Sequence, residues 1–226
     1  ITRALVEIYS DTKLANAFAF RGGTAIQKLF YDKPTRFSED IDLVQIHQGP
    51  IGSLIDSIRK KLAPWLGTPK RKLKEMRVAL IYRYQSEEVP VRQMRLKIEI
   101  NTDECFTELG YQKKTLETKN KWFSSSADIT TYDVNEILGS KMLALFQRKK
   151  GRDLYDLALA LQKLPDLDIK KLIQCFNRYA KRPISRAQFE ANLFEKMLDP
   201  VFRADVGPLL TTEMPRFNFE EAAKNR

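Results

Sequence analysis

Two aspartates in the stretch SEDIDL have the spacing of a metal-binding pair. Asp40 and Asp42 are two positions apart. In an extended strand such residues project from the same face, about 7 Å apart along the chain. Carboxylates placed in this way can share one or two magnesium ions whose other ligands are phosphate oxygens and water. Taken alone, the pattern is more typical of a solvated turn or a strand edge.

The residues ahead of the aspartates favour phosphate binding. Gly22 and Gly23 end an apolar run and open a helix-like run, so bare backbone N–H groups and the helix dipole can approach a phosphate chain. Thr24 can cap that helix or add a hydroxyl. Ser38 shares a face with Asp40 if the strand extends back that far, and its hydroxyl could then donate to a phosphate oxygen. The alternatives are a plain strand–turn–helix and a cap or turn serine.

A third carboxylate is expected if a hydroxyl attacks the α-phosphate, because a metal held by three acids can lower the pKa of that hydroxyl. Glu99 fits this role, since it lies on the polar face of the alternating stretch QMRLKIEINT. The alternative is an exposed glutamate that pairs with Lys97 or Arg95.

The elements that must position these residues follow two patterns. Up to about residue 130 helical and alternating stretches are mixed, and from Asp133 onward the spacing is almost entirely helical. We therefore predict an α/β part over residues 1–130 and a helical part over residues 131–226. The expected elements are helices at 2–17, 24–31, 49–66, 133–147, 152–164, 167–180 and 185–198, and strands at 17–20, 40–46, 72–85 and 93–102, the last two forming a hairpin.

Charged residues in the helical part can converge. Lys141 and Arg148 are seven residues apart on one helix face, so both cations can point into one cleft. Arg152 and Asp156 are four apart on the next helix and can pair. The alternative for Arg148, Arg152 and Asp156 is pairing on a solvated helix surface.

The overall charge favours a polyanionic partner. The 226 residues carry 39 Lys and Arg against 29 Asp and Glu, a formal net charge of +10. Such a balance is typical of proteins that bind nucleic acid, although a generally basic surface is the alternative. No long apolar run or signal peptide is evident, so we expect a cytoplasmic protein without a membrane segment. His47 is the only histidine, which argues against zinc sites and histidine-based triads.

Four motifs in order resemble one family. RGGTAIQKLF, RFSEDIDL, RLKIEIN and EILGSKMLALFQRKKGRDLYDLALAL are similar to motifs of the AbiEii/AbiGii-type toxin nucleotidyltransferases, within the DNA-polymerase-β-like superfamily. The resemblance implies an α+β fold, with a nucleotidyltransferase-type mixed sheet, flanking helices and a helical C-terminal bundle.

The resemblance also implies roles for individual residues. The metal ligands would be Asp40, Asp42 and Glu99, and the catalytic set would add Lys141 and Asp153. The nucleotide would be bound by Gly22, Gly23, Thr24, Ser38, Lys141, Arg148 and Arg152, with Asp156 orienting one of the arginines.

The activity implied by the resemblance is magnesium-dependent transfer of NMP from an NTP to RNA, with release of pyrophosphate. The expected acceptor is the 3′ end of tRNA, and the expected partner is a cognate antitoxin encoded nearby. Two alternatives stay open at this point. One is NMP transfer to a hydroxyl of a target protein or antitoxin, and the other is a non-catalytic RNA- or partner-binding module.

Overall fold

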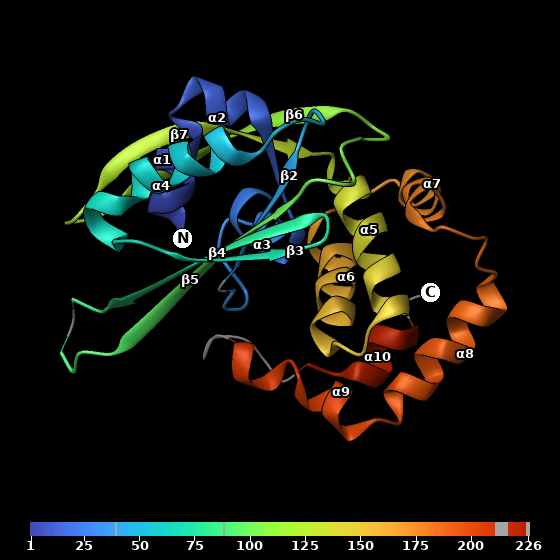
Figure 1. The fold of residues 1–226 in the computed structure, drawn as a ribbon. Coiled ribbons are helices and arrows are strands. Elements are labelled where there is room, and N and C mark those ends of the chain that lie inside the picture. Colours follow the sequence, from blue (N-terminus) through green and yellow to red (C-terminus); the bar gives the residue numbers. More distant parts are fainter. Residues whose placement is uncertain (39, 88, 211–216, 225–226) are drawn as a thin grey trace. The chain divides into compact units, whose positions relative to one another are not determined.

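The chain divides into two compact units in a computed structural model that describes residues 1–38, 40–87, 89–210 and 217–224 (Figure 1). The first unit comprises Ile1–Asp32 and Glu39–Tyr132, and the second comprises Lys33–Ser38 and Asp133–Arg226. The short segment Lys33–Ser38 thus belongs with the helical C-terminal part although it precedes the aspartates in sequence. The division into separate domains, residues 1–130 and 131–226, stays a prediction.

A seven-stranded mixed sheet forms the centre of the first unit, in the order β3-β4-β5-β2-β1-β7-β6. The strand pairs β2–β5 and β1–β7 are parallel, and the other neighbours are antiparallel. The expected mixed sheet is therefore confirmed. The strands are β1 Phe18–Arg21, β2 Asp40–Gln45, β3 Lys70–Lys74, β4 Arg77–Gln85, β5 Gln93–Asn101, β6 Tyr111–Lys119 and β7 Ser124–Tyr132.

Alternation of side chains explains the central strands. In β5, Leu96, Ile98 and Ile100 are buried, whereas Lys97 and Glu99 on the other face are half-buried. The predicted hairpin between β4 and β5 is confirmed, with all nine residues of β5 paired to β4.

Two features of the sheet differ from the sequence-based expectation. The stretch 72–85 is not one strand, because Glu75 adopts a positive φ of 33° and turns the chain between β3 and β4. Strands β6 and β7 were not predicted. Their pattern is too polar to reveal them, since Leu116 is the one buried residue of β6.

The helices of the first unit are α1 Thr2–Tyr9, α2 Thr12–Ala17, α3 Gly22–Leu29 and α4 Gly52–Leu66. The predicted helix over 2–17 is two helices, because Asp11 accepts hydrogen bonds from the backbone N–H groups of Lys13 and Leu14 and so starts a new one. Helix α3 begins at Gly22 rather than at Thr24. Helices α1, α2 and α4 pack against one another (Figure 1).

The second unit is helical in the described part of the chain. Its elements are α5 Val134–Gln147, α6 Gly151–Lys163, α7 Ile169–Tyr179, α8 Arg186–Met197, α9 Pro200–Ala204, a 3-10 turn Gly207–Leu209 and α10 Phe219–Lys224. Asp133 caps α5 by accepting from the backbone N–H of Asn135. Helices α5 and α7 pack closely at Gly139, where an added Cβ would lie 2.7 Å from the carbonyl oxygen of Leu172.

Candidate active site

The turn from β1 into α3 lies directly against Asp42. Gly22 has a φ of +82°, and a Cβ atom added to it would lie only 2.4 Å from Oδ2 of Asp42. Positive φ and this close approach both favour glycine at position 22. The sheet explains the proximity, because Arg21 at the end of β1 pairs with Asp42 in the antiparallel register.

The two aspartates occupy one face of β2. Asp40 and Asp42 are half-buried, while Ile41 and Leu43 between and after them are buried on the other face. In the parallel register of β2 and β5, Asp42 pairs with Glu99. Paired residues lie on the same face of a sheet, about 4.8 Å apart between strands. The third predicted acid is therefore the neighbour of the second.

Thr24 fastens the start of α3 to the carboxylate strand. Its Oγ1 donates to the backbone carbonyl oxygen of Asp40 at 2.6 Å, and the residue is almost fully buried. Together with Gly22, this bond fixes the position of the helix N-terminus relative to β2.

Glu99 is held by two cations in this structure. Its carboxylate forms ion pairs with Nζ of Lys97 and, at 3.3 Å, with a guanidinium nitrogen of Arg77. Partial burial acts to raise the pKa of Glu99, but Lys97 and Arg77 outweigh burial and lower it below its usual value. Partial burial acts to lower the pKa of Lys97, and Glu99, Asp40 and Asp42 together reverse this and raise it. The alternative for Glu99, pairing with Lys97 or Arg95, is therefore observed for Lys97. The second partner of Glu99 is Arg77 and not Arg95.

The three predicted acids could bind a magnesium ion that is also held by the phosphates of a bound nucleotide. They fit this role better than that of a metal site built from protein ligands alone. Across the described ranges, no three His, Cys, Asp or Glu side chains are arranged to hold a metal ion. Magnesium is commonly bound by one or two carboxylates plus substrate phosphates and water. Asp40 and Asp42 supply such carboxylates on one face of β2. Glu99 would have to give up its contacts with Lys97 and Arg77 to join them.

Ser38 lies ahead of β2, which begins at Asp40. The position between them, residue 39, is outside the described residues. A phosphate-binding role for Ser38 stays a prediction.

Lys141 lies in a buried charge network of the second unit. Its Nζ is 3.1 Å from Oδ1 of Asp153 and 3.0 Å from Oδ2 of Asp156, and its side chain is 7% exposed. The side chains of both aspartates are fully buried. A buried ammonium between two buried carboxylates is the arrangement in which such charges are tolerated.

Two arginines complete this network from different segments. Arg148 bonds Asp153 through Nε at 2.7 Å and through a second guanidinium nitrogen at 2.9 Å. Arg36 binds Asp156 in the same two-point manner, at 2.7 and 2.8 Å. We name this set, Arg36, Lys141, Arg148, Asp153 and Asp156, the buried charge network.

The predicted pairing of Asp156 with Arg152 is wrong. Asp156 is fully buried and its partners are Arg36 and Lys141, whereas the backbone N–H of Arg152 donates to Asp205. Sequence reasoning missed Arg36 as a member of the network. Its position within the quoted motif RFSEDIDL was the one available signal.

The aspartates of the network stay ionised by charge pairing. Burial acts to raise the pKa of Asp153, but Lys141 and Arg148 outweigh it and lower the pKa. Burial likewise acts to raise the pKa of Asp156, and Lys141 and Arg36 lower it overall.

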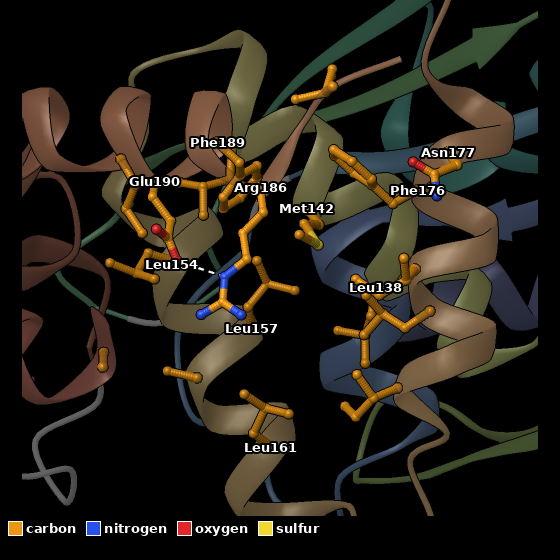
Figure 2. A pocket seen from close by; sticks show the side chains of 18 of the residues that line it. Leu138, Met142, Leu154, Leu157, Leu161, Phe176, Asn177, Arg186, Phe189 and Glu190 are labelled. Atoms are coloured by element: carbon orange, nitrogen blue, oxygen red, sulfur yellow. Dashed lines mark hydrogen bonds and ion pairs between the residues drawn. The ribbon is translucent and has the colours of Figure 1, made fainter. Parts of the chain in front are cut away.

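A cavity of about 950 Å³ lies between helices of the second unit (Figure 2). Most of its lining is apolar, including Leu138, Leu157 and Phe176. Its two charged residues, Arg186 and Glu190, pair with each other at 2.9 Å. The cavity therefore lacks the converging charges of a catalytic site. Its lining residues all belong to the second unit, whereas Asp40, Asp42 and Glu99 belong to the first.

The fold resembles solved structures at low sequence identity. JHP933 from Helicobacter pylori matches with a TM-score of 0.61 and 19% identity, over 98% of this chain and 84% of that one. A putative nucleotidyltransferase from H. pylori matches with a TM-score of 0.59 and 18% identity, over 98% and 86%. MenT4, a nucleotidyltransferase toxin from Mycobacterium tuberculosis H37Rv, matches with a TM-score of 0.54 and 14% identity, over 86% and 80%. No curated protein matches the chain significantly.

A family match over nearly the whole chain defines the protein as a nucleotidyltransferase. The model of the family described as nucleotidyl transferase AbiEii toxin, Type IV TA system, matches residues 3–225. The chain therefore belongs to the AbiEii family of nucleotidyltransferase toxins, whose systems pair a toxin with an antitoxin. Within the described residues, no helix has the length and apolar character needed to cross a bilayer.

Proposed function

We propose that the protein transfers a nucleoside monophosphate from an NTP to a hydroxyl of RNA, with the 3′ end of tRNA as the preferred acceptor. The observation that carries this proposal is the alignment of Asp42 with Glu99 across β2 and β5, directly beside the turn at Gly22. In the proposed reaction the acceptor oxygen bonds to the α-phosphorus. The bond to the bridging oxygen of the β-phosphate breaks, pyrophosphate leaves, and the hydroxyl proton passes to solvent.

The predicted site residues of the first unit have the following roles in this proposal. The backbone N–H groups of Gly22, Gly23 and Thr24 would bind the triphosphate at the positive end of α3. Ser38, which belongs to the second unit, would add a hydroxyl. Asp40 and Asp42 would hold Mg²⁺, which when bound neutralises phosphate charge and polarises the reacting oxygens. Glu99 would orient the acceptor hydroxyl after releasing Lys97 and Arg77.

The second unit would contribute cations to the phosphates. Lys141 uses two of its three N–H donors on Asp153 and Asp156, which leaves one for a phosphate oxygen. Asp153 would act as a positioning residue, because it contacts both Lys141 and Arg148. Arg148 has a half-exposed side chain and Arg152 is also partly exposed, so both have access to a ligand.

The acceptor is proposed to be RNA because of charge. A formal net charge of +10 suits a polyanion better than a protein surface of average charge. An RNA acceptor, the partner antitoxin and the translation machinery would all be met in the cytoplasm, where we propose that the protein acts.

The experiment that tests the proposal is transfer from each α-labelled NTP in turn to purified tRNA or to RNA-free lysate, with Mg²⁺ or with a chelator. Labelled tRNA with the wild type and at least about 100-fold less with Asp42→Asn would support it, since such a loss corresponds to about 2.7 kcal/mol of transition-state stabilisation. Asp56→Asn is the matched control, because this exposed aspartate lies on α4 and pairs with its helix neighbour Arg59. Label confined to protein, or label unaffected by Asp42→Asn or by chelation, would contradict the proposal.

A further inference from the structure

The register of the sheet continues the carboxylate face to the edge strand β3. Asp40 pairs with Lys97, which pairs with Ile81, which pairs with Lys70. Residues paired in register share a face of the sheet. The edge lysine and the candidate metal ligand are therefore on the same face, three strands apart.

The neighbouring rows repeat this arrangement. In one row, Asp42 pairs with Glu99, Glu99 with Ala79, and Ala79 with Lys72. In the next, Asn101 and Arg77 lead to Lys74. On the other side of the first row, Arg83 pairs with Arg95. We name this set of basic residues the cationic face: Lys70, Lys72, Lys74, Arg77, Arg83, Arg95 and Lys97.

The opposite face of the same strands has a different character. In β4 it carries Val78, Leu80 and Tyr82, all buried. The basic residue there on β3 is Arg71, which pairs with Leu80. Positive charge is thus concentrated on the side of the sheet that bears the aspartates.

Most of the cationic face has no compensating partner. Lys97 and Arg77 contact Glu99, but the other five residues form no ion pair with any residue in the part of the chain that the structure describes. Arg83 and Arg95 are directly opposite each other and both are exposed. Like charges in this position repel and destabilise a sheet. A polyanionic ligand would remove that repulsion.

We propose that the backbone of the acceptor RNA lies along the cationic face, with its 3′ end directed to Asp40 and Asp42. This inference rests on the proposed function and specifies how the acceptor is held. The phosphates would be neutralised by Lys and Arg with release of counterions. The three strand spacings between β2 and β3 amount to about 14 Å, enough for several nucleotides of a single strand to cross the face.

Edge-strand lysines also prevent pairing between the sheets of different molecules. That role depends on charge along the edge irrespective of face, so Arg71 would serve it as well as Lys72 does. RNA binding to the aspartate side depends on the face. Substitutions of Arg71 and Lys72, which are adjacent on β3, can therefore distinguish protection of the sheet edge from RNA binding.

The test is equilibrium binding of labelled tRNA without NTP, between 50 and 200 mM salt (about the range over which phosphate contacts weaken binding strongly). We expect Lys70→Gln/Lys72→Gln/Lys74→Gln to weaken binding by at least about 10-fold and to lower the salt slope by about 2. Among single variants, Lys72→Gln should weaken binding by at least about threefold, and Arg71→Gln by less than about twofold. Equal effects of Lys72→Gln and Arg71→Gln, or unchanged binding by the triple variant, would overturn the inference.

Failure of this inference is distinguishable from failure of the proposed function. If Asp42→Asn abolishes tRNA labelling but the triple variant binds tRNA like the wild type, the function stands and the cationic face is not the RNA site. If the triple variant loses tRNA binding but label enters only protein, the face binds RNA while the proposed acceptor is wrong. All β3 side chains concerned are exposed, and an unchanged urea midpoint will confirm that the variants fold.

Discussion

Asp42 fills the space that a side chain on residue 22 would need, because an added Cβ would lie 2.4 Å from its Oδ2. The contact joins the β1–α3 turn to the carboxylate strand. A side chain on residue 22 would therefore displace the Asp42 carboxylate.

The first prediction concerns this contact. Gly22→Ala should reduce nucleotidyl transfer by about 100-fold, because the methyl group displaces the Asp42 carboxylate and misplacement by about 1 Å can have that effect. The positive φ should add a loss of about 1–2 kcal/mol in the free energy of unfolding. Transfer kinetics and urea unfolding measure the two effects. Gly52→Ala is the control, since its added Cβ has no described atom within 4 Å apart from its chain neighbours and the backbone of its own helix. Equal activity of the two variants would contradict the prediction.

The second prediction concerns the stability of the buried charge network. Asp156→Asn should lower the free energy of unfolding by about 3–5 kcal/mol, because it leaves the buried guanidinium of Arg36 without its counter-charge. Urea unfolding at pH 7 measures the loss. Asp56→Asn removes an exposed carboxylate and should change stability by less than about 0.5 kcal/mol. A loss below about 1 kcal/mol for Asp156→Asn would show that the network is not desolvated as described.

A third prediction compares two cations that share Asp153. Lys141→Met should be strongly destabilising, by about 3 kcal/mol, because it removes the cation between two fully buried carboxylates. Arg148→Gln should cost about 1 kcal/mol, since the side chain of Arg148 is 51% exposed and Asp153 keeps Lys141. Thermal and urea unfolding of both variants test this order, and the reverse order would contradict it.

The fourth prediction is a dependence of stability on pH. The folded state lowers the pKa of both Asp153 and Asp156, because their cationic partners outweigh burial. The unfolded chain, with aspartate pKa values near about 3.9, therefore binds more protons on acidification. The stabilisation is fully present above about pH 5 and is lost as the pH falls through the folded pKa values.

Urea unfolding between about pH 3 and pH 7 measures this dependence, since the range spans the aspartate titration. In Asp156→Asn the loss of stability on acidification should be smaller than in the wild type, because one of the two carboxylates no longer titrates. An identical slope in the two proteins would show that folding leaves the pKa of Asp156 unchanged, which would contradict the prediction.

The fifth prediction concerns the start of α6. Gly151→Ala should destabilise the protein by about 1–3 kcal/mol, because the added Cβ would lie 2.1 Å from the backbone carbonyl oxygen of Phe202, which cannot rotate away. Calorimetry of this variant beside Gly52→Ala tests the expectation. A melting temperature equal to that of the control would contradict it.

The sequence alone was sufficient for features that depend on neighbours in the chain. Strand β2, the β4–β5 hairpin and the principal C-terminal helices follow from local periodicity and from caps such as Asp133. Strands β6 and β7 could not be predicted from the sequence, because a polar hairpin at the sheet edge lacks an alternating apolar pattern. Quoted motifs also indicated the family, which the match over residues 3–225 confirms. The roles assigned to individual motif residues stay predictions.

Tertiary structure decided which distant residues meet. Arg36 and Asp156 are 120 positions apart, and the local i to i+4 rule instead suggested Arg152 as the partner of Asp156. The register that places Glu99 beside Asp42, and Lys72 on their face, is likewise set by strand pairing. A shift of one residue would turn every side chain of a strand to the other face. Periodicity tells which residues of one strand share a face, whereas only the packed sheet determines which faces of different strands coincide.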